Sequence, residues 1–568
     1  MKVILLVFSF GISLFSLAQT ALFVPDTLSG SSISLTMHQD SVAFFQGHKS
    51  KTFGYNQYPY LGPTLILRKG QSISMSVTNE IGDTTTVHWH GLHVPPSCDG
   101  GPHTMIMAGE TWNPQFTVMD QASTFWYHPH LHGKTALQAI KGAAGLIIVK
   151  DSNETALHLP SNYGIDDFPV IVQSQQYDHN NQAMPLGMQD STILINGARA
   201  NYEGHSVYLN APAQMVRLRL LNASGERVFN FGFSNNHAFQ QIGSDGGLLA
   251  QPFDTTRIRL SPGERAEIVL NLTGMEGQDL FLRNIGTELP MGVQGGPTMP
   301  MPPGSPPMDS PLNGVDFDFM KIHVVVPTAN PVTQIPLQLN PITPLSPSAA
   351  IVSREIRFTA DSMMVMDGPF YFNDSSFNME RIDFVIPVNQ IETWKLVNET
   401  MVGHPFHIHD VQFYLFDRNN EFPPLNERGR KDVVYVPMGD SVRFVTQFSD
   451  FTDTIIPYMF HCHILMHEDA GMMGQFLVVP ANYVGLQELK KIERMKVYPN
   501  PVVNQLSFDF DDLNSPIDIR VLDQNGCVVL TKSLNSVESL DVSSLSKGFY
   551  TVLVRSNQRY FLSKFVKE

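Results

Sequence analysis

The 568-residue chain has few cysteines, a shortage of positive charge and almost no long apolar runs. Three cysteines, Cys98, Cys462 and Cys527, are too few for a disulfide framework, so large apolar cores must stabilise the fold. Lys and Arg number 37 against 53 Asp and Glu, and the resulting net charge of −16 argues against a nucleic-acid partner. The composition, 42% hydrophobic with 41 Gly and 39 Pro, is that of a loop-rich globular protein.

One apolar run lies at the N-terminus, from Val3 to Leu17, directly after Met1-Lys2. Its length of about 15 residues falls short of the roughly 20 needed to span a bilayer, and no other stretch qualifies. A charged start, a short apolar segment and small residues up to Ala18 are typical of a secretory signal peptide. We therefore expect residues 1–18 to be removed and the mature protein to be exported.

Short β-rich runs separated by Gly, Pro, Asn and Asp extend from about residue 20 to 482, and amphipathic helical patterns are rare. This pattern favours an all-β, sandwich-like architecture. Breaks near 152–167 and in the Pro-rich, Met-containing segment 290–311 divide the region. The expected domains are 19–152, 153–328 and 329–482.

The composition changes again after a linker at 483–496. Short strands fill the last 70 or so residues, which contain Leu540–Leu545, Gly548–Tyr550 and a terminal Lys564–Lys567. This pattern resembles the C-terminal sorting domain of bacterial type IX secretion substrates. The resemblance implies a small Ig-like β-sandwich at 497–568 that the secretion machinery recognises, and an ordinary adhesive Ig-like domain is the alternative.

Histidine pairs of the form His-x-His carry the strongest chemical signal. In a strand, side chains two residues apart point to the same face, so each pair can present two imidazoles to one site. Eight imidazoles suffice for two or three metal ions, and imidazole suits copper, zinc, iron and nickel. The pairs are His88/His90, His128/His130 (overlapping His130/His132), His407/His409 and His461/His463.

Cys462 lies between His461 and His463 and must therefore point to the opposite face. With two histidines and a methionine, a thiolate forms the His₂Cys site with a weak axial Met that blue copper uses for electron transfer. Cys462 would collect single electrons there, and its neighbours would deliver them to a polynuclear centre, with dioxygen as the acceptor. The other ligands of this site would be His404, His467 and Met472.

These residues resemble the four copper motifs of the multicopper oxidases: His88-Trp89-His90-Gly91, His128-Pro129-His130, His404-Pro405-Phe406-His407-Ile408-His409, and His461-Cys462-His463 with His467 and Met472. The similarity spans about residues 40–480 and includes Ile242–Gly247 and Leu260–Arg265. It implies three cupredoxin-like Greek-key β-sandwich domains, with a trinuclear copper cluster between the first and third and a middle domain that acts largely as a spacer. It also implies that four one-electron oxidations of a donor are coupled to reduction of dioxygen to water.

The resemblance further implies four copper ions. The type 1 ion would take His404, Cys462, His467 and Met472, and the type 2 ion would take His88 and His407. One type 3 ion would take His90, His128 and His463, and the other would take His130, His409 and His461.

Reduction of dioxygen to water consumes protons, so carboxylates should lie near the cluster to relay them. Asp99 and Glu468 resemble the acids assigned that role in bacterial copper-efflux and bilirubin-type oxidases. The alternative is that each is a solvated loop acid or a group that orients a histidine.

The electron donor is left open between two classes. A coordinating Met472 implies a lower type 1 potential than in high-potential fungal laccases, which favours easily oxidised donors such as phenols. Thioethers prefer cuprous ion, so a dedicated cuprous oxidase for copper detoxification is the alternative, although methionines in a β domain are more often core filler. Its entry site would combine Met363, Met364, Met366 and Met401 with Asp361, Asp367 or Glu399. A non-catalytic copper-binding surface protein would lack some copper ligands, and none is missing.

Overall fold

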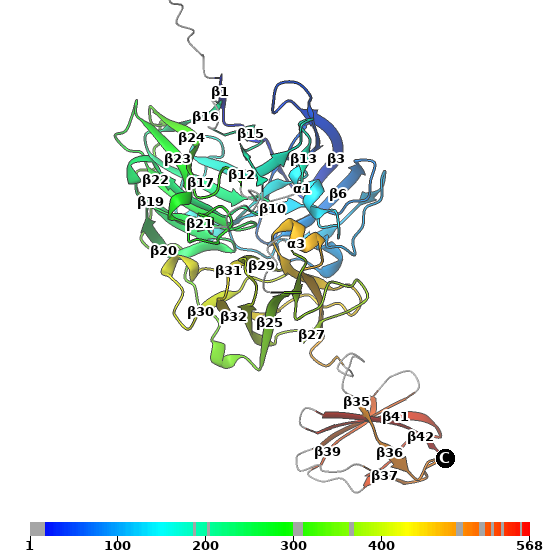
Figure 1. The fold of residues 1–568 in the computed structure, drawn as a ribbon. Helices are drawn as coiled ribbons and strands as arrows, with labels where there is room; N and C mark the ends of the chain where they lie inside the picture. Colours follow the sequence, from blue (N-terminus) through cyan, green and yellow to red (C-terminus); the bar gives the residue numbers. More distant parts are fainter. Residues whose placement is uncertain are drawn as a thin grey trace, which may run out of the picture. The chain divides into compact units, whose positions relative to one another are not determined.

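The computed structural model describes residues 18–185, 189–200, 205–298, 310–362, 368–483, 492–509, 517–523, 528–534, 539–556 and 559–568. The chain separates into two compact units, Met1–Ala481 and Asn482–Glu568 (Figure 1). The expected signal peptide lies outside the described residues apart from its last residue, Ala18. Within the described residues, every helix is too short or too polar to cross a membrane.

The first sandwich packs two sheets around a core that includes Leu65, Trp89 and Phe125. Side chains alternate between the core and the surface: in β6 (Ser72–Glu80), Ile73, Met75 and Val77 are buried, and the residues between them are more exposed. One sheet has the order β2 (Thr27–Ser29), β5 (Thr64–Arg68), β11 (Gly145–Lys150), β10 (Ser123–His128), β7 (His88–His90). The other has the order β4 (Ser50–Tyr55), β3 (Ser32–Val42), β6 (Ser72–Glu80), β8 (Thr111–Trp112), with β9 (Gln115–Thr117) also beside β6.

The middle sandwich has the largest apolar core, which includes Val170, Leu218 and Phe319. One sheet has the order β1 (Ala18–Ala21), β16 (His205–Pro212), β24 (Asp316–Val325), β23 (Asp279–Ile285), β18 (Phe229–Phe233), β21 (Ile258–Leu260). The other has the order β15 (Ala198–Arg199), β14 (Thr192–Ile195), β12 (Asp167–Tyr177), β17 (Met215–Asn222), β22 (Arg265–Asn271), β19 (Phe239–Ser244), β20 (Gly247–Thr255), with β13 (Ala183–Met184) beside β12. β1 thus pairs in parallel with the middle sandwich, although residue 18 was expected to end the signal peptide and residues 19–21 to begin the first domain.

The third sandwich encloses a core rich in aromatic residues, including Trp394, Phe406 and Phe460. One sheet has the order β26 (Phe370–Phe372), β25 (Val352–Ala360), β28 (Ile391–Asn398), β32 (Ser441–Gln447), β30 (Tyr414–Arg418). The other has the order β27 (Phe384–Pro387), β34 (Met473–Val479), β33 (Tyr458–Cys462), β29 (His404–Ile408), β31 (Val433–Val436). Its central pair, β33 and β29, is antiparallel and opposes His461 to His407.

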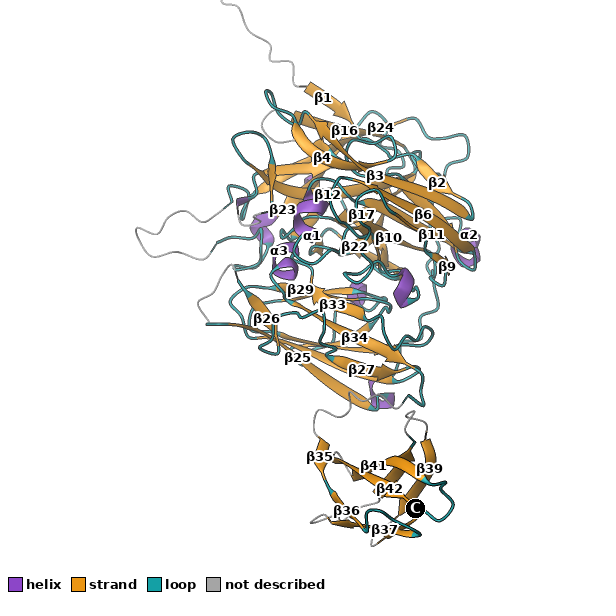
Figure 2. Cartoon of the chain, turned by 90° about the vertical axis from the view of Figure 1, so that its right-hand side faces the viewer, coloured by secondary structure: helices purple, strands orange, loops and turns teal. Residues whose placement is uncertain are grey.

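The first and third sandwiches meet where two short helices pack together, α1 (Thr135–Ile140) and α3 (Leu465–Asp469) (Figure 2). Asp469 at the end of α3 accepts hydrogen bonds from the main-chain N–H groups of Thr135 (3.0 Å) and Ala136 (2.9 Å), which begin α1. Free N–H groups at a helix start need such acceptors, so Asp469 joins the two helices. A further helix, α2 (Ser152–Ala156), follows β11 and is capped by Asp151.

Thr124 joins the first sandwich to a buried ion-pair network of the middle one. Arg219 pairs with Asp167 (Nε–Oδ1, 2.7 Å) and with Glu267 (Nη1–Oε1, 2.8 Å). Thr124 on β10 donates to Glu267 at 2.6 Å and accepts from Arg219 at 2.9 Å. β10 carries His128, so these contacts hold one histidine strand against the middle sandwich.

The C-terminal unit is a small β domain with its own core, which includes Ile519, Val552 and Phe565. One sheet has the order β35 (Ile492–Arg494), β42 (Arg559–Lys567), β41 (Gly548–Ser556), β38 (Ile517–Leu522), β39 (Val528–Leu534). The other has the order β36 (Lys496–Tyr498), β37 (Gln505–Asp509), β40 (Ser539–Asp541). The chain is therefore all-β in each of its sandwiches, as the sequence predicted.

Candidate metal centres

Four short segments converge at the boundary of the first and third sandwiches, and each carries one histidine pair. The eight imidazoles are buried, with exposed fractions of 0–1%. Their ring nitrogens form three groups in which the candidate ligand atoms lie within 4.8 Å of one another. The groups are His88/His407/His409, His90/His128/His463 and His130/His409/His461.

Most of these rings are held by a hydrogen bond from Nδ1. His88 donates to the carbonyl of Asp99 (2.8 Å), His407 to the carbonyl of Asp432 (2.8 Å), and His409 to the Asp99 carboxylate (2.8 Å). His128 and His461 donate to the main-chain carbonyls of the residues that follow them, at 2.8 and 3.0 Å. A proton on Nδ1 leaves the lone pair on Nε2, which is the form a metal binds.

The unpaired atoms fit bound metal ions. Among the described residues, Nε2 of His88, His130, His407, His409 and His461 is buried without a hydrogen-bond partner. Buried polar atoms are nearly always paired, so five unpaired acceptors in one place fit a set of cation ligands. Burial lowers the pKa of His130, His407 and His461 well below its ordinary value and that of His409 to about 4, which keeps the rings neutral.

A separate site lies inside the third sandwich. Sγ of Cys462 lies 3.5 Å from Nδ1 of His404 and 3.6 Å from Nδ1 of His467, and the two Nδ1 atoms are 3.2 Å apart. Met472 is fully buried in the same core, and its carbonyl accepts from the Cys462 N–H at 3.0 Å. Burial raises the pKa of the Cys462 thiol well above its usual range, so a thiolate here needs a metal cation beside it. This donor set of two imidazoles, a thiol and a thioether suits copper.

The two sites occupy opposite faces of one segment. Cys462 at the end of β33 points into the core of the third sandwich, whereas His461 contacts His130 and His463 contacts His90 of the first sandwich. An electron that enters at the sulfur of Cys462 can reach either imidazole through a few covalent bonds.

Two buried acids contact the histidine groups from different sides. Oδ2 of Asp99 accepts from His409, and Oδ1 lies 3.5 Å from Nδ1 of His88. Burial opposes ionisation, but His409 and His88 hold the pKa of Asp99 well below its usual range. Glu468 on α3 places its two oxygens 3.2 Å from Nδ1 of His130 and 3.3 Å from Nδ1 of His461, and burial raises its pKa well above the usual range.

Sequence reasoning missed several contributors. Thr400 lies 2.8 Å from Nε2 of His404 through its hydroxyl, which leaves Nδ1 facing Cys462. Asp432 contacts both His90 and His407, at 3.2 Å and 2.8 Å. The expected spacer role of the middle sandwich is incomplete, because Arg265 forms two hydrogen bonds with Asp432. Nothing in the spacing marks Asp432 or Arg265, since their partners are distant in sequence. Thr400 lies only four residues before His404, but a lone threonine at that spacing is not distinctive.

The expected methionine site is described only in part. Met363, Met364, Met366 and Asp367 lie outside the described residues, whereas Met401 is half-buried. Glu399 is paired with Arg357 at 3.3 Å. The described residues therefore leave this expectation open.

Family models match each of the three large sandwiches and the C-terminal unit. Three models described as multicopper oxidase match residues 36–154, 158–289 and 351–482. A fourth, described as secretion system C-terminal sorting domain, matches residues 496–568. These matches confirm both resemblances that the sequence motifs indicated.

Individual proteins with similar sequences or structures agree. The multicopper oxidase mco of Staphylococcus haemolyticus is 34% identical over 454 residues, 78% of this chain and 88% of the relative. The cell division protein FtsP of Photorhabdus laumondii is 28% identical over 473 residues, 82% of this chain and 93% of the relative. Among solved structures, a laccase-like multicopper oxidase, CueO, from the lignin-degrading bacterium Ochrobactrum sp. matches with a TM-score of 0.70 and 30% identity, covering 81% of this chain and all of that one.

Proposed function

The chain belongs to the multicopper oxidase family, whose copper-dependent oxidations reduce dioxygen, and we propose that it is an exported oxidase with four copper ions and a phenolic donor. His404, Cys462, His467 and Met472 would hold the type 1 ion. His88 and His407 would hold the type 2 ion, and His90/His128/His463 and His130/His409/His461 the type 3 pair. These ions would supply one-electron steps and a binding place for dioxygen.

The observation that carries this proposal is the arrangement around β33. A thiol with two imidazoles lies on one face, and eight further imidazoles lie beyond the other, with five orphaned Nε2 atoms among them. Asp99 and Glu468 contact those imidazoles and would relay the protons that dioxygen reduction consumes. A non-catalytic relative would not need this complete set of donors.

His467 is the most exposed of the four candidate type 1 ligands. It keeps 7% of its surface exposed, whereas Cys462, His404 and Met472 are fully buried. Beside its helix lies a small cavity of about 20 Å³ lined by Leu465, Met466, Gln175 and Glu226, among others. The N–H of Leu465 donates to the carbonyl of Gly225 at 2.9 Å, which fixes Glu226 next to α3.

Glu226 supports a donor that releases a proton when it is oxidised. Burial raises its pKa to about 7, and the described residues give its carboxylate neither a salt bridge nor a side-chain hydrogen bond. A phenol would lose one electron toward His467 while its hydroxyl proton passes to the Glu226 carboxylate, and a phenoxyl radical would leave. The similar CueO is named for oxidase activity towards lignin model compounds, which agrees with this class.

Cuprous ion is the second candidate donor, because the thioethers of Met184 and Met466 line the same cavity as Glu226. One experiment on copper-loaded protein distinguishes the two candidate donors. Dioxygen consumption would be measured with a phenol, with cuprous ion and with hexacyanoferrate(II), which has no proton to lose.

For a phenol oxidase, Glu226→Gln slows only the phenol reaction, and Met184→Leu/Met466→Leu slows none. For a cuprous oxidase, loss of the Met184 and Met466 thioethers slows the cuprous reaction selectively. Copper-loaded protein that consumes no dioxygen with any donor would overturn the assignment as an oxidase.

A further inference from the structure

Asp432 is the residue at which the three sandwiches meet. It directly precedes β31, and its two carboxylate oxygens accept parallel hydrogen bonds from Nη1 and Nη2 of Arg265 in the middle sandwich, each 2.6 Å long. Oδ1 also lies 3.2 Å from Nε2 of His90 in the first sandwich. All three side chains are fully buried, with exposed fractions of 0–1%.

The main chain of Asp432 holds a second histidine. Its carbonyl accepts from Nδ1 of His407 at 2.8 Å, so one residue orients both His90 and His407. The two rings stack with centroids 3.8 Å apart and planes within 11° of each other.

His90 is turned the opposite way from its neighbours. In four of the other rings, those of His88, His407, His409 and His461, Nδ1 donates to an oxygen and Nε2 has no hydrogen-bond partner among the described residues. In His90 it is Nε2 that faces an oxygen, and Nδ1 lies 3.3 Å from Nε2 of both His128 and His463. When the Asp432 carboxylate accepts the Nε2 proton of His90, the lone pair of that ring is on Nδ1. Nδ1 faces the other two histidines of the His90/His128/His463 group.

The two middle-domain motifs, 242–247 and 260–265, supply the side chains that position Asp432. Arg265 also donates to the carbonyls of Thr124 (3.1 Å), Gly263 (3.0 Å) and Asp245 (3.0 Å), so all five of its N–H donors are used. The Asp245 carboxylate accepts from the Arg265 main-chain N–H (2.8 Å) and pairs with Lys431 (2.9 Å), the residue before Asp432.

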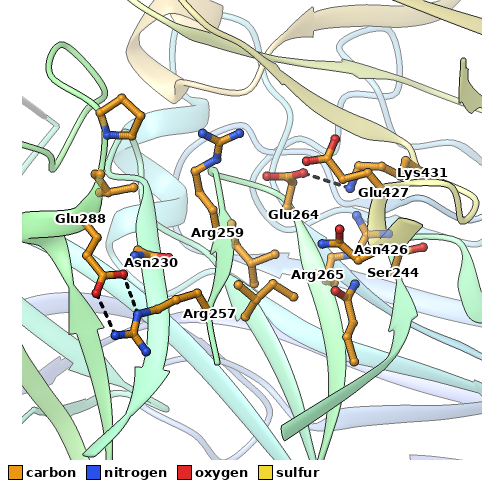
Figure 3. A pocket seen from close by; sticks show the side chains of 15 residues that line it. Asn230, Ser244, Arg257, Arg259, Glu264, Arg265, Glu288, Asn426, Glu427 and Lys431 are labelled. Atoms are coloured by element: carbon orange, nitrogen blue, oxygen red, sulfur yellow. Dashed lines mark hydrogen bonds and ion pairs between the residues drawn. The ribbon is translucent and has the colours of Figure 1, made fainter. Parts of the chain in front are cut away.

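Packing leaves Asp432 little freedom to move. A Cβ at Gly91, the glycine after His90, would lie 2.5 Å from Oδ2 of Asp432 and 2.7 Å from Nη2 of Arg265. On its other side, Arg265 lines a polar cavity of about 240 Å³ together with Glu264 and Lys431, whose ion pair stands beside it (Figure 3). The Asp432 carboxylate is therefore confined between Gly91 and the Arg265 guanidinium.

We propose that Asp432, clamped by Arg265, is a positioning residue that turns His90 to bind copper through Nδ1 and aligns His407, so the middle sandwich governs assembly of the trinuclear cluster. This inference rests on the proposed copper sites. The type 1 site is independent of the clamp, because the Asp432 side chain contacts none of its ligands.

The test measures copper retention rather than turnover. Groups that orient a ligand typically contribute 10–100-fold to metal affinity. In chelator competition, Asp432→Asn should retain the trinuclear copper about 10–100-fold more weakly than wild type and alter the type 2 electron paramagnetic resonance signal. The blue absorption of the type 1 thiolate should stay unchanged per chain.

Two further variants separate positioning from stability. Glu392→Gln breaks another two-bond arginine–carboxylate pair, that of buried Glu392 with Arg354 in the third sandwich, and this pair contacts no histidine, so the variant should lower the melting temperature but keep wild-type copper retention. Arg265→Lys keeps the positive charge beside Asp432 and so favours folding, but it cannot form the two parallel hydrogen bonds of the guanidinium. It should shift retention and the type 2 signal in the same direction as Asp432→Asn.

The inference is overturned if Arg265→Lys or a folded Asp432→Asn matches wild type in both readouts, or if Glu392→Gln loses copper equally. Wild-type protein that binds no copper would instead refute the proposed function.

Discussion

Replacing Glu468 by Gln tests the proposed proton relay with little change of shape. Both carboxylate oxygens lie within 3.3 Å of an imidazole nitrogen, and neither forms a well-aligned hydrogen bond with a described residue. Gln has the same size but cannot give up a proton. General acid–base catalysis contributes typically 10²–10⁴-fold, so dioxygen reduction should slow by about that factor, or about 3–5 kcal/mol in the barrier.

The assay separates this step from donor oxidation. Protein is fully reduced without oxygen and then mixed with dissolved dioxygen, and the return of the blue absorption is followed. The matched control is Asp469→Asn, which removes a carboxylate one residue away that caps α1 and does not face the cluster. It should cost about 1 kcal/mol of stability and leave reoxidation near the wild-type rate.

Three outcomes are informative. Slow reoxidation in Glu468→Gln alone supports the relay. Reoxidation at the wild-type rate removes Glu468 from that role. Loss of copper from the variant would show that Glu468 orients His130 and His461 instead.

Three further changes have defined results. Cys462→Ser should abolish the blue absorption and donor oxidation and lower the copper content from about four to about three ions per chain, as measured by metal analysis. Thr400→Val should raise the type 1 potential in a redox titration, because Nε2 of His404 loses its 2.8 Å partner and the ring becomes a weaker donor. Removing copper with a chelator should lower the melting temperature in calorimetry, since ions that bind only the folded chain stabilise it.

Local patterns in the sequence account for much of this molecule. Strand alternation predicted that His461 and His463 share a face that Cys462 does not, and those three side chains do lie that way. The all-β class followed from short runs between turn residues. The pairing of residues 18–21 with the middle sandwich did not follow, because a four-residue strand carries no signal for its partner.

Contacts between distant segments explain why the rest could not be predicted. His90 and Asp432 are 342 residues apart, and Arg265 and Asp432 are 167 apart. A lone aspartate before a strand has the same local pattern whether it faces solvent or a histidine. Motifs 242–247 and 260–265 were visible, yet their purpose depends on a carboxylate in another sandwich. A buried arginine needs such an anion. An Arg in a glycine-containing turn that leads into a buried strand therefore predicts an acidic partner, which can lie in another domain.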